Sequence, residues 1–356
     1  MSKICVFCGN LPERKNKEHI IPKWLIELTG NPNRLVQFGP IWNSKTLELE
    51  FGEFAFDQFQ FPACEKCNSE HSHLEVKAKE VLQQLLNEKP LSSEDLSILL
   101  DWLDKIRIGL WLAYNYLQKN LSSVEPNYYI SNRIGETDRA VFIYKSDYEK
   151  AGISFSGANT PAFQYRPVCY NLRINQFCFF NLSTDFLISK GLGFPYAKEI
   201  YFTESQEMEY LLKKGRDNVS FPLVRSSYNK KCTEIYQPIF SHYGRREQIA
   251  YLYETPHVKS MSQDFDSGVG KILIKVDNQV KEYPSNKSNS WIPKVTWDLS
   301  ELMDVVGEQV LNSQIYYLNR GGNYNKVSTE KKNLIKEQHK IAKQINRLFL
   351  DNLIKS

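Results

Sequence analysis

The sequence predicts an α+β protein: an N-terminal module and a helical connector, followed by a larger, mostly antiparallel β-rich domain and a C-terminal amphipathic helix. Three observations lead to this fold class. Two CxxC pairs lie near the N-terminus, long segments with helical spacing follow them and end the chain, and short aromatic and β-branched runs lie between. We expect the module, connector, β-rich domain and final helix at residues 1–90, 91–122, 123–325 and 326–356.

Composition supports an ordinary globular protein. The chain has 356 residues, of which 42% are hydrophobic and 24% charged, enough for about two domains with apolar cores. No run approaches the ~18 consecutive apolar residues of a membrane span, and the N-terminus lacks the apolar core of a signal peptide. We therefore expect a cytoplasmic protein without a membrane partner. The net charge of +4 alone predicts no partner.

The two cysteine pairs are Cys5/Cys8 and Cys64/Cys67. In a reducing compartment, such pairs are typical of metal ligands, because two of them complete a tetrahedral four-thiolate zinc site. A chance pairing or a redox CxxC remains an alternative, although a redox motif needs only one pair. The 55 residues between the pairs far exceed the ~15–20 of a compact ribbon, which indicates an insertion.

The inserted segment and the region after it have readable elements. EHIIPKWLIELTG predicts a short extended piece ended by Pro22 and then a helical turn ending at Gly30. RLVQFGPIWNSKTLELEF alternates as a hairpin does. After the second pair, Leu74, Val81 and Leu85 share a helical stripe. Ser92–Asp95 resembles a capping signal before a long helix that is apolar on more than one face and is therefore expected to be central.

From about 126 to 320, short aromatic and β-branched runs predict strands in NYYI, AVFIY, FCFFNL, EIYF, QIAYLYE, KILIKV and QIYYL. The final helix carries an apolar stripe of Leu334, Ile341, Ile345 and Leu348. Residues 320–356 hold nine Lys or Arg against three Asp or Glu, a net of +6. A solvated face explains this charge, but clustered cations also suit phosphate contacts. The residues considered for nucleic-acid contact are Lys336, Lys340 and Lys343, with Arg245 and Arg246 in the SHYGRRE loop.

The order of the N-terminal motifs is specific. Cys5-x-x-Cys8, then Glu18-His19-Ile20-Ile21-Pro22, then Cys64-x-x-Cys67-Asn68 resembles the HNH endonuclease family, in its four-cysteine zinc-ribbon branch with a ββα-metal fold. The resemblance covers roughly residues 1–80 and does not extend to the rest of the chain.

The resemblance implies a role for each motif residue. His19 is expected to be the general base, and Glu18 and Asn68 to hold a catalytic divalent cation, Mg²⁺ or Mn²⁺ or else Ni²⁺. The zinc of the four cysteines would be structural. These residue types suit the reaction, because phosphodiester hydrolysis needs an activated water and stabilisation of the charge on the phosphoryl oxygens.

Two positions depart from the family pattern. Members often have an Asn about five residues before the second CxxC, where this chain has Phe59, so Gln58, Gln60 or Asp57 would have to replace that brace. Where common members place a Lys, this chain has His71. Because residues 68, 71, 72 and 75 share one helix face, His71 or Glu75 could add a ligand or contact phosphate; an exposed helix residue is the alternative for His71.

The resemblance therefore predicts a metal-dependent HNH endonuclease. Its expected substrate is DNA, the commoner target of that family, and such an enzyme fits restriction or anti-phage defence. The β-rich domain would select the target or control activity through a regulatory ligand, a partner protein or homo-oligomerisation. The alternative is a zinc ribbon of weak or no activity that acts as a nucleic-acid-binding or adaptor module. An RNA-cleaving toxin differs only in substrate.

Overall fold

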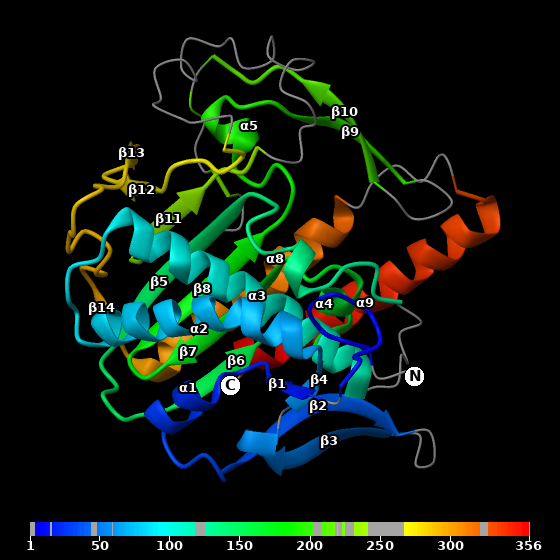
Figure 1. Cartoon of the computed structure of the whole chain (residues 1–356). Helices are drawn as coiled ribbons and strands as arrows, with labels where there is room; N and C mark the ends of the chain where they lie inside the picture. The colour runs from blue at the N-terminus through cyan, green and yellow to red at the C-terminus, as the bar shows by residue number, and fades with distance from the viewer. Residues whose placement is uncertain are drawn as a thin grey trace.

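In the computed structural model, a central antiparallel sheet lies between helices on its two faces (Figure 1). The residues it describes are 4–14, 16–43, 48–58, 60–117, 125–202, 208–217, 219, 223–224, 231–240, 267–320 and 327–355. The strand order of the sheet is β13-β12-β11-β5-β8-β7-β6, and β14 pairs in parallel with the end of β5. Its strands are β5 (Arg139–Ser146), β6 (Ile153–Ser156), β7 (Cys169–Ile174), β8 (Phe177–Ser183), β11 (Thr233–Gln237), β12 (Leu273–Val276), β13 (Gln279–Glu282) and β14 (Thr296–Trp297).

Side chains alternate between the two faces of the sheet, and in the central strands β11, β5, β8 and β7 both faces are buried. On β5, Val141 and Ile143 point to one core, while Phe142 and Tyr144 point to the other. This is why the strands AVFIY and FCFFNL are continuous apolar runs rather than alternating ones.

One face is covered by α2 (Glu65–Leu86) and α3 (Ser93–Leu117), and the other by α8 (Leu299–Asn319). The predicted cap of α3 is confirmed: the Ser92 amide donates to Asp95 Oδ2 (2.8 Å), and the Asp95 amide donates to Ser92 Oγ (3.1 Å). From Trp102 to Asn115 every residue of α3 is buried. The predicted connector is thus central, and one continuous core joins Cys5, α3 and the sheet. The domain boundaries themselves stay predictions.

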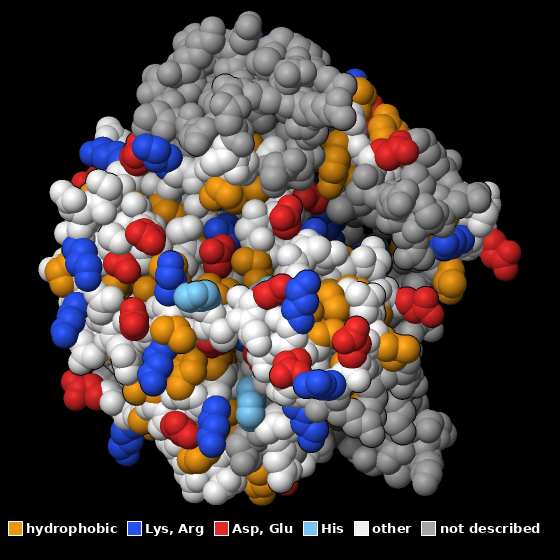
Figure 2. All heavy atoms as spheres, viewed as in Figure 1, with side chains coloured by type: hydrophobic (Ala, Val, Ile, Leu, Met, Phe, Trp, Pro, Cys, Tyr) orange, Lys and Arg blue, Asp and Glu red, His pale blue; other side chains and the backbone are white. Residues whose placement is uncertain are grey.

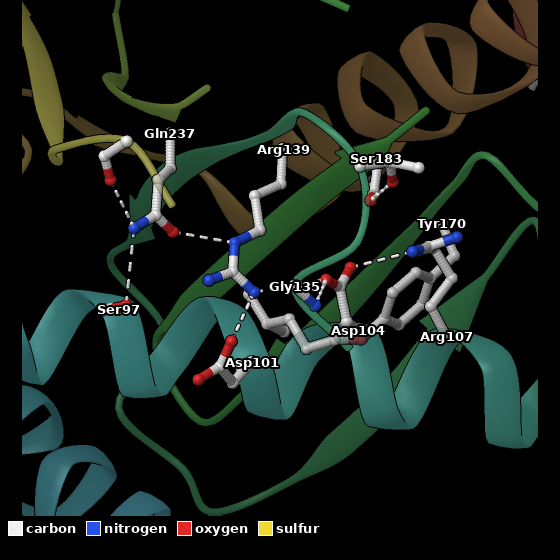
Figure 3. Close-up of polar contacts among 12 residues, drawn as sticks. Ser97, Asp101, Asp104, Arg107, Gly135, Arg139, Tyr170, Ser183 and Gln237 are labelled. Atoms are coloured by element: carbon white, nitrogen blue, oxygen red, sulfur yellow. Dashed lines mark hydrogen bonds and ion pairs between the residues drawn. The ribbon is translucent and has the colours of Figure 1, made fainter. Parts of the chain in front are cut away.

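Acidic and basic side chains bridge α3 to the sheet inside this core (Figure 3). Arg139 of β5 donates to Asp101 (2.5 Å) and to Gln237 of β11 (2.8 Å). Asp104, which is fully buried, accepts from Arg107 at 2.8 Å and lies 3.3 Å from Arg139 Nη1. The buried charges compensate one another, as they must in a medium that solvates ions poorly.

The N-terminal segment forms a smaller β structure beside α2. β1 (Asn16–His19) pairs with β4 (Gln60–Ala63), and β4 leads directly into α2. Between the two strands lie α1 (Lys23–Leu28), the predicted hairpin of β2 (Leu35–Asn43) and β3 (Glu48–Ala55), and η1 (Phe56–Gln58). The remaining described elements are η2 (Ile130–Asn132), α4 (Pro161–Tyr165), α5 (Ser189–Leu192), the pair β9 (Tyr196–Phe202) and β10 (Met208–Lys213), and α9 (Thr329–Lys355).

Two predicted strands were wrong. NYYI ends in the η2 turn, and QIYYL belongs to α8. In α8, Leu302, Val306 and Val310 recur every four residues, and Asp298 caps the helix by accepting from the amides of Ser300 and Glu301. This longer helical pattern outweighs the β propensity of the aromatic run. QIAYLYE lies outside the described residues.

The final helix α9 is present, but three of the four residues of its predicted apolar stripe do not pack, and the fourth, Ile345, is half-buried. Leu334, Ile341 and Leu348 are exposed, and the helix instead turns Ala342 and Asn346 toward α4 and α8. Ala342 is small enough to lie against Ala162 and Leu318, and the Asn346 amide donates to Gln314 Oε1 (2.9 Å). Ala342 and Asn346 are thus the buried residues of this part of α9, where larger apolar residues were expected.

Candidate zinc centre and adjoining histidine site

The four N-terminal cysteines converge on one point. Their sulfur atoms all lie within 4.8 Å of one another, and Cys8 Sγ is 3.8 Å from Cys64 Sγ. In a tetrahedral site with Zn–S bonds of about 2.3 Å, the sulfurs lie about 3.8 Å apart. The four cysteines can therefore hold a zinc ion. None of the seven cysteines forms a disulfide.

Local backbone structure brings the two pairs together. In the first pair, a tight turn returns the Gly9 amide to the Cys5 carbonyl (2.9 Å), and the Cys5 amide donates to the Asn10 carbonyl (2.8 Å). In the second, Cys64 is the N-cap of α2 and Cys67 lies in its first turn. The Cys64 amide also donates to Cys5 Sγ (3.2 Å). The positive end of the α2 dipole at this position favours negatively charged sulfur.

The charges of the cysteine group explain why it suits a cation. Burial raises the pKa of Cys64 to about 11, and it also raises the pKa of Cys67. Burial acts on Cys8 in the same direction, but the Asn10 amide and the neighbouring thiols donate to its sulfur and lower its pKa. One thiolate thus opposes the formation of the others, and a divalent cation would supply the charge that lets all four ionise.

His19 is the last residue of β1, and the register of the β1–β4 pair places it opposite Gln60. Gln60 Nε2 lies 2.9 Å from His19 Nε2. This distance makes the Gln60 amide and the imidazole hydrogen-bonding partners, and the tautomer of the ring sets which of them donates. Gln60 is one of the three residues predicted to replace the family's Asn as a brace, and it is in contact with His19. Phe59 itself lies outside the described residues.

Glu18 is placed differently from the expectation that it holds a cation beside His19. Adjacent strand residues point to opposite sides, and Glu18 faces the interior, where the Lys105 ammonium lies 2.6 Å from Glu18 Oε1. Lys105 also pairs with Glu75 of α2, whose Oε2 accepts from Trp24 Nε1 (3.1 Å). Burial lowers the pKa of Lys105, but attraction to Glu75 and Glu18 outweighs it and raises the pKa above its ordinary value.

Asn68 and His71 lie on α2 after the second cysteine pair. The Asn68 side chain is half-buried. The His71 ring is fixed: its Nδ1 lies 2.9 Å from the Cys67 carbonyl, its Nε2 lies 3.4 Å from Ser131 Oγ, and it packs on Phe7 with centroids 4.4 Å apart. His71 therefore joins the first cysteine turn to η2.

These contacts bear on the predicted catalytic cation. Within the described residues, the cysteines are the only group of three or more His, Cys, Asp or Glu side chains arranged to hold one metal ion. The Glu18 carboxylate is paired with Lys105, so Glu18 would have to leave this ion pair to bind a cation together with His19 and Asn68.

The residues considered for nucleic-acid contact lie elsewhere. Lys336 and Lys340 are exposed on α9, where Lys340 lies 3.7 Å from Glu337. Lys343 donates to Asn319 Oδ1 (2.9 Å). Arg245 and Arg246 lie outside the described residues. A cavity of about 460 Å³ between α8, α9 and the β6–α4 loop contains none of the predicted site residues.

Lys105 is the site residue that the sequence analysis missed. Its signal was present, since Asp104, Lys105 and Arg107 are charged residues inside an otherwise apolar helix. Such charges are buried only when they are paired.

No helix in the described part of the chain is long and apolar enough to cross a membrane. Comparisons with models of protein families, with curated proteins and with solved structures found no match.

Proposed function

We propose that the N-terminal module is an HNH-type nuclease centre that hydrolyses phosphodiester bonds of nucleic acid, with DNA as the favoured substrate. The observation that carries the proposal is the joint placement of the motif residues. A β1–β4 pair leads into α2, four cysteines join the first turn to the strand-to-helix junction, and His19 lies beside Gln60. The motif order in the sequence matches this ββα arrangement.

The proposed chemistry assigns one task to each group. His19 would take a proton from the attacking water at Nδ1, while the Gln60 amide, presenting its oxygen to Nε2–H, would hold the ring in the tautomer with Nδ1 unprotonated. Zinc on the four cysteines would fix the helix that carries Asn68 and His71 against the first turn. The exposed lysines of α9 could contact phosphates beyond the cleavage point.

A specific observation favours the alternative, a zinc-stabilised module that binds nucleic acid without cleaving it. Lys105 neutralises Glu18, the carboxylate that the resemblance assigns to the catalytic cation. A nuclease would need another cation ligand or a rearrangement of this ion pair. The two functions make opposite predictions in a cleavage assay.

Cleavage should depend on His19. Supercoiled plasmid incubated with the zinc-loaded protein and Mg²⁺, Mn²⁺ or Ni²⁺ should be nicked, and His19→Ala should slow the reaction by about 10²–10³-fold, the usual contribution of a general base. His73→Ala, an exposed histidine on the same helix as Asn68, is the matched control and should leave the rate unchanged. Equal rates for wild type and His19→Ala with every metal, on DNA and on labelled RNA, would exclude the nuclease. DNA binding without cleavage would then identify the alternative.

Gln60 is expected to act as a positioning residue for His19. Gln60→Ala should lower kcat about tenfold with little change in KM, because a ring that has lost this contact spends less time in the productive orientation. Gln60→Glu should move the acidic limb of the pH–rate profile to higher pH by about one unit, because a carboxylate favours the charged imidazole. The same mutations made with His19→Ala should have no further effect on the rate. Additive losses in the double variants would show that Gln60 acts independently of His19.

A further inference from the structure

A small pocket outside the N-terminal module is lined by an excess of cations. It lies between the end of α4, the residues that follow β8, α5, the start of β9 and the C-terminal end of α8. Arg166, Lys190 and Arg320 line it, and Asp185 is the one carboxylate among its lining residues. Figure 2 shows a hollow in this region of the surface, below the residues drawn in grey, with Lys or Arg side chains inside it. We refer to these three residues and their surroundings as the cationic pocket.

The charged groups of the cationic pocket do not neutralise one another. The Asp185 carboxylate accepts a hydrogen bond from the Tyr210 hydroxyl (2.7 Å). Arg166 donates to the Tyr317 carbonyl and Arg320 to the Tyr316 hydroxyl, both at 2.9 Å. Lys190 lies 5.6 Å from the centre of the Tyr196 ring. Across the described ranges, none of the three cations forms an ion pair with a carboxylate, so the contacts that orient them leave their charge uncompensated.

The cations of this region also shift the pKa values of neighbouring side chains. Arg133, directly after η2, lies 4.6 Å over the Tyr128 ring. Burial and Asp185 raise the pKa of Tyr210, while Arg133 and Arg166 oppose that rise, so both arginines lie near the Asp185–Tyr210 pair. Burial, Arg166 and Lys343 lower the pKa of His339 to about 4. Like charges that line one pocket repel one another, and an anion bound among them removes that cost.

We propose that the cationic pocket binds a phosphate group. Phosphate matches the donors present, because two guanidinium groups can each present paired N–H donors to its oxygens and Lys190 adds a compact charge. The Asp185 carboxylate, held by Tyr210, sits at the wall and would accept from a hydroxyl or a protonated phosphate oxygen. The phosphate belongs either to a free phosphorylated ligand or to the backbone of a nucleic-acid strand. The proposal does not depend on the nuclease activity of the N-terminal module.

Two binding measurements on the full-length protein test it. Orthophosphate and pyrophosphate titrated by calorimetry in chloride buffer should bind the wild type. The variants Lys190→Gln and Arg320→Gln, both of exposed residues that should not disturb folding, should each weaken binding about tenfold, as expected for loss of one charge-assisted contact. Lys281→Gln, an exposed lysine on the distant edge strand β13, should bind as the wild type does.

The second measurement identifies the source of the phosphate. Fluorescence anisotropy with a single-stranded oligonucleotide should show weaker binding and a smaller salt dependence in Arg320→Gln if the phosphate is part of a strand. Unchanged oligonucleotide binding together with lost pyrophosphate binding assigns the pocket to a free ligand. The proposal is overturned if pyrophosphate binds the wild type no better than it binds the Lys190→Gln/Arg320→Gln double variant. That outcome leaves the cleavage test of His19 unaffected.

Discussion

The Cys64→Ser variant is expected to purify with far less than one zinc ion per chain and to unfold with a free energy lower by roughly 5 kcal/mol. Structural zinc sites contribute about 10–16 kcal/mol to the folding of small domains, and a site with three sulfurs retains only part of this. The loss has a direct route into the core, because the turn of the first pair carries Val6 and Phe7, which are buried with α3. Elemental analysis and urea denaturation measure the two effects.

Cys232→Ser provides the control, since Cys232 is a half-buried cysteine outside the zinc group. It should retain the zinc content of the wild type. A wild-type protein that holds no zinc after expression in zinc-supplemented medium, or a Cys64→Ser variant as stable as the wild type, would contradict a structural zinc site.

Lys105→Met should destabilise the protein by about 3–5 kcal/mol, although methionine fills a similar volume. Removing one partner of a buried ion pair strands the other charge, and here two carboxylates, Glu18 and Glu75, lose their cation together. Adding Glu18→Gln to Lys105→Met should recover part of the loss, because one of the stranded charges is then gone. Urea denaturation of the four members of this cycle gives the coupling energy between the two residues.

The effect of Lys105 should depend on pH in a defined direction. Its pKa in the folded protein is raised above the ordinary 10.5, so its ion pairs stabilise the fold fully below that pH. Their contribution is lost as the pH rises through the higher pKa of the folded state. The difference between wild type and Lys105→Met should therefore be constant near neutral pH and shrink above about 10.5. Lys77→Met, an exposed lysine on α2, should show neither the loss nor the pH dependence.

Local chemistry made much of the fold predictable from the sequence. The reciprocal Ser92–Asp95 cap, the apolar runs of β5 and β8, and the hairpin before the second cysteine pair all depend on residues close in the chain. The convergence of the four cysteines was also predictable, because metal-ligand spacing encodes a long-range contact. QIYYL was misassigned because a short apolar run fits a strand or a helix equally well until the residues before it are considered.

The contacts that decide the candidate site were less accessible. The partners Lys105 and Glu18 are 87 residues apart, and no pattern in either segment names the other. The register of β1 with β4 places Gln60, rather than Gln58, beside His19. This register could not be predicted from the sequence, because α1 and the β2–β3 hairpin separate the two strands along the chain. The sequence did not show whether Ile341 or Ala342 of α9 faces α8. The shape of the helices that α9 packs against decides this, and Ala342 is the buried one.

Because α3 is buried on all sides in the core that contains both Cys5 and the sheet, we expect the cysteine-bearing segment and the sheet to unfold together. A helix enclosed from Trp102 to Asn115 offers no seam at which the chain could be cut without exposing two tryptophans and several unpaired charges. We therefore expect that the cysteine-bearing segment does not fold when it is separated from α3, and that its resistance to proteolysis follows the stability of the sheet. A cavity-forming mutation in the core of the sheet should therefore also speed proteolysis of the segment that carries His19.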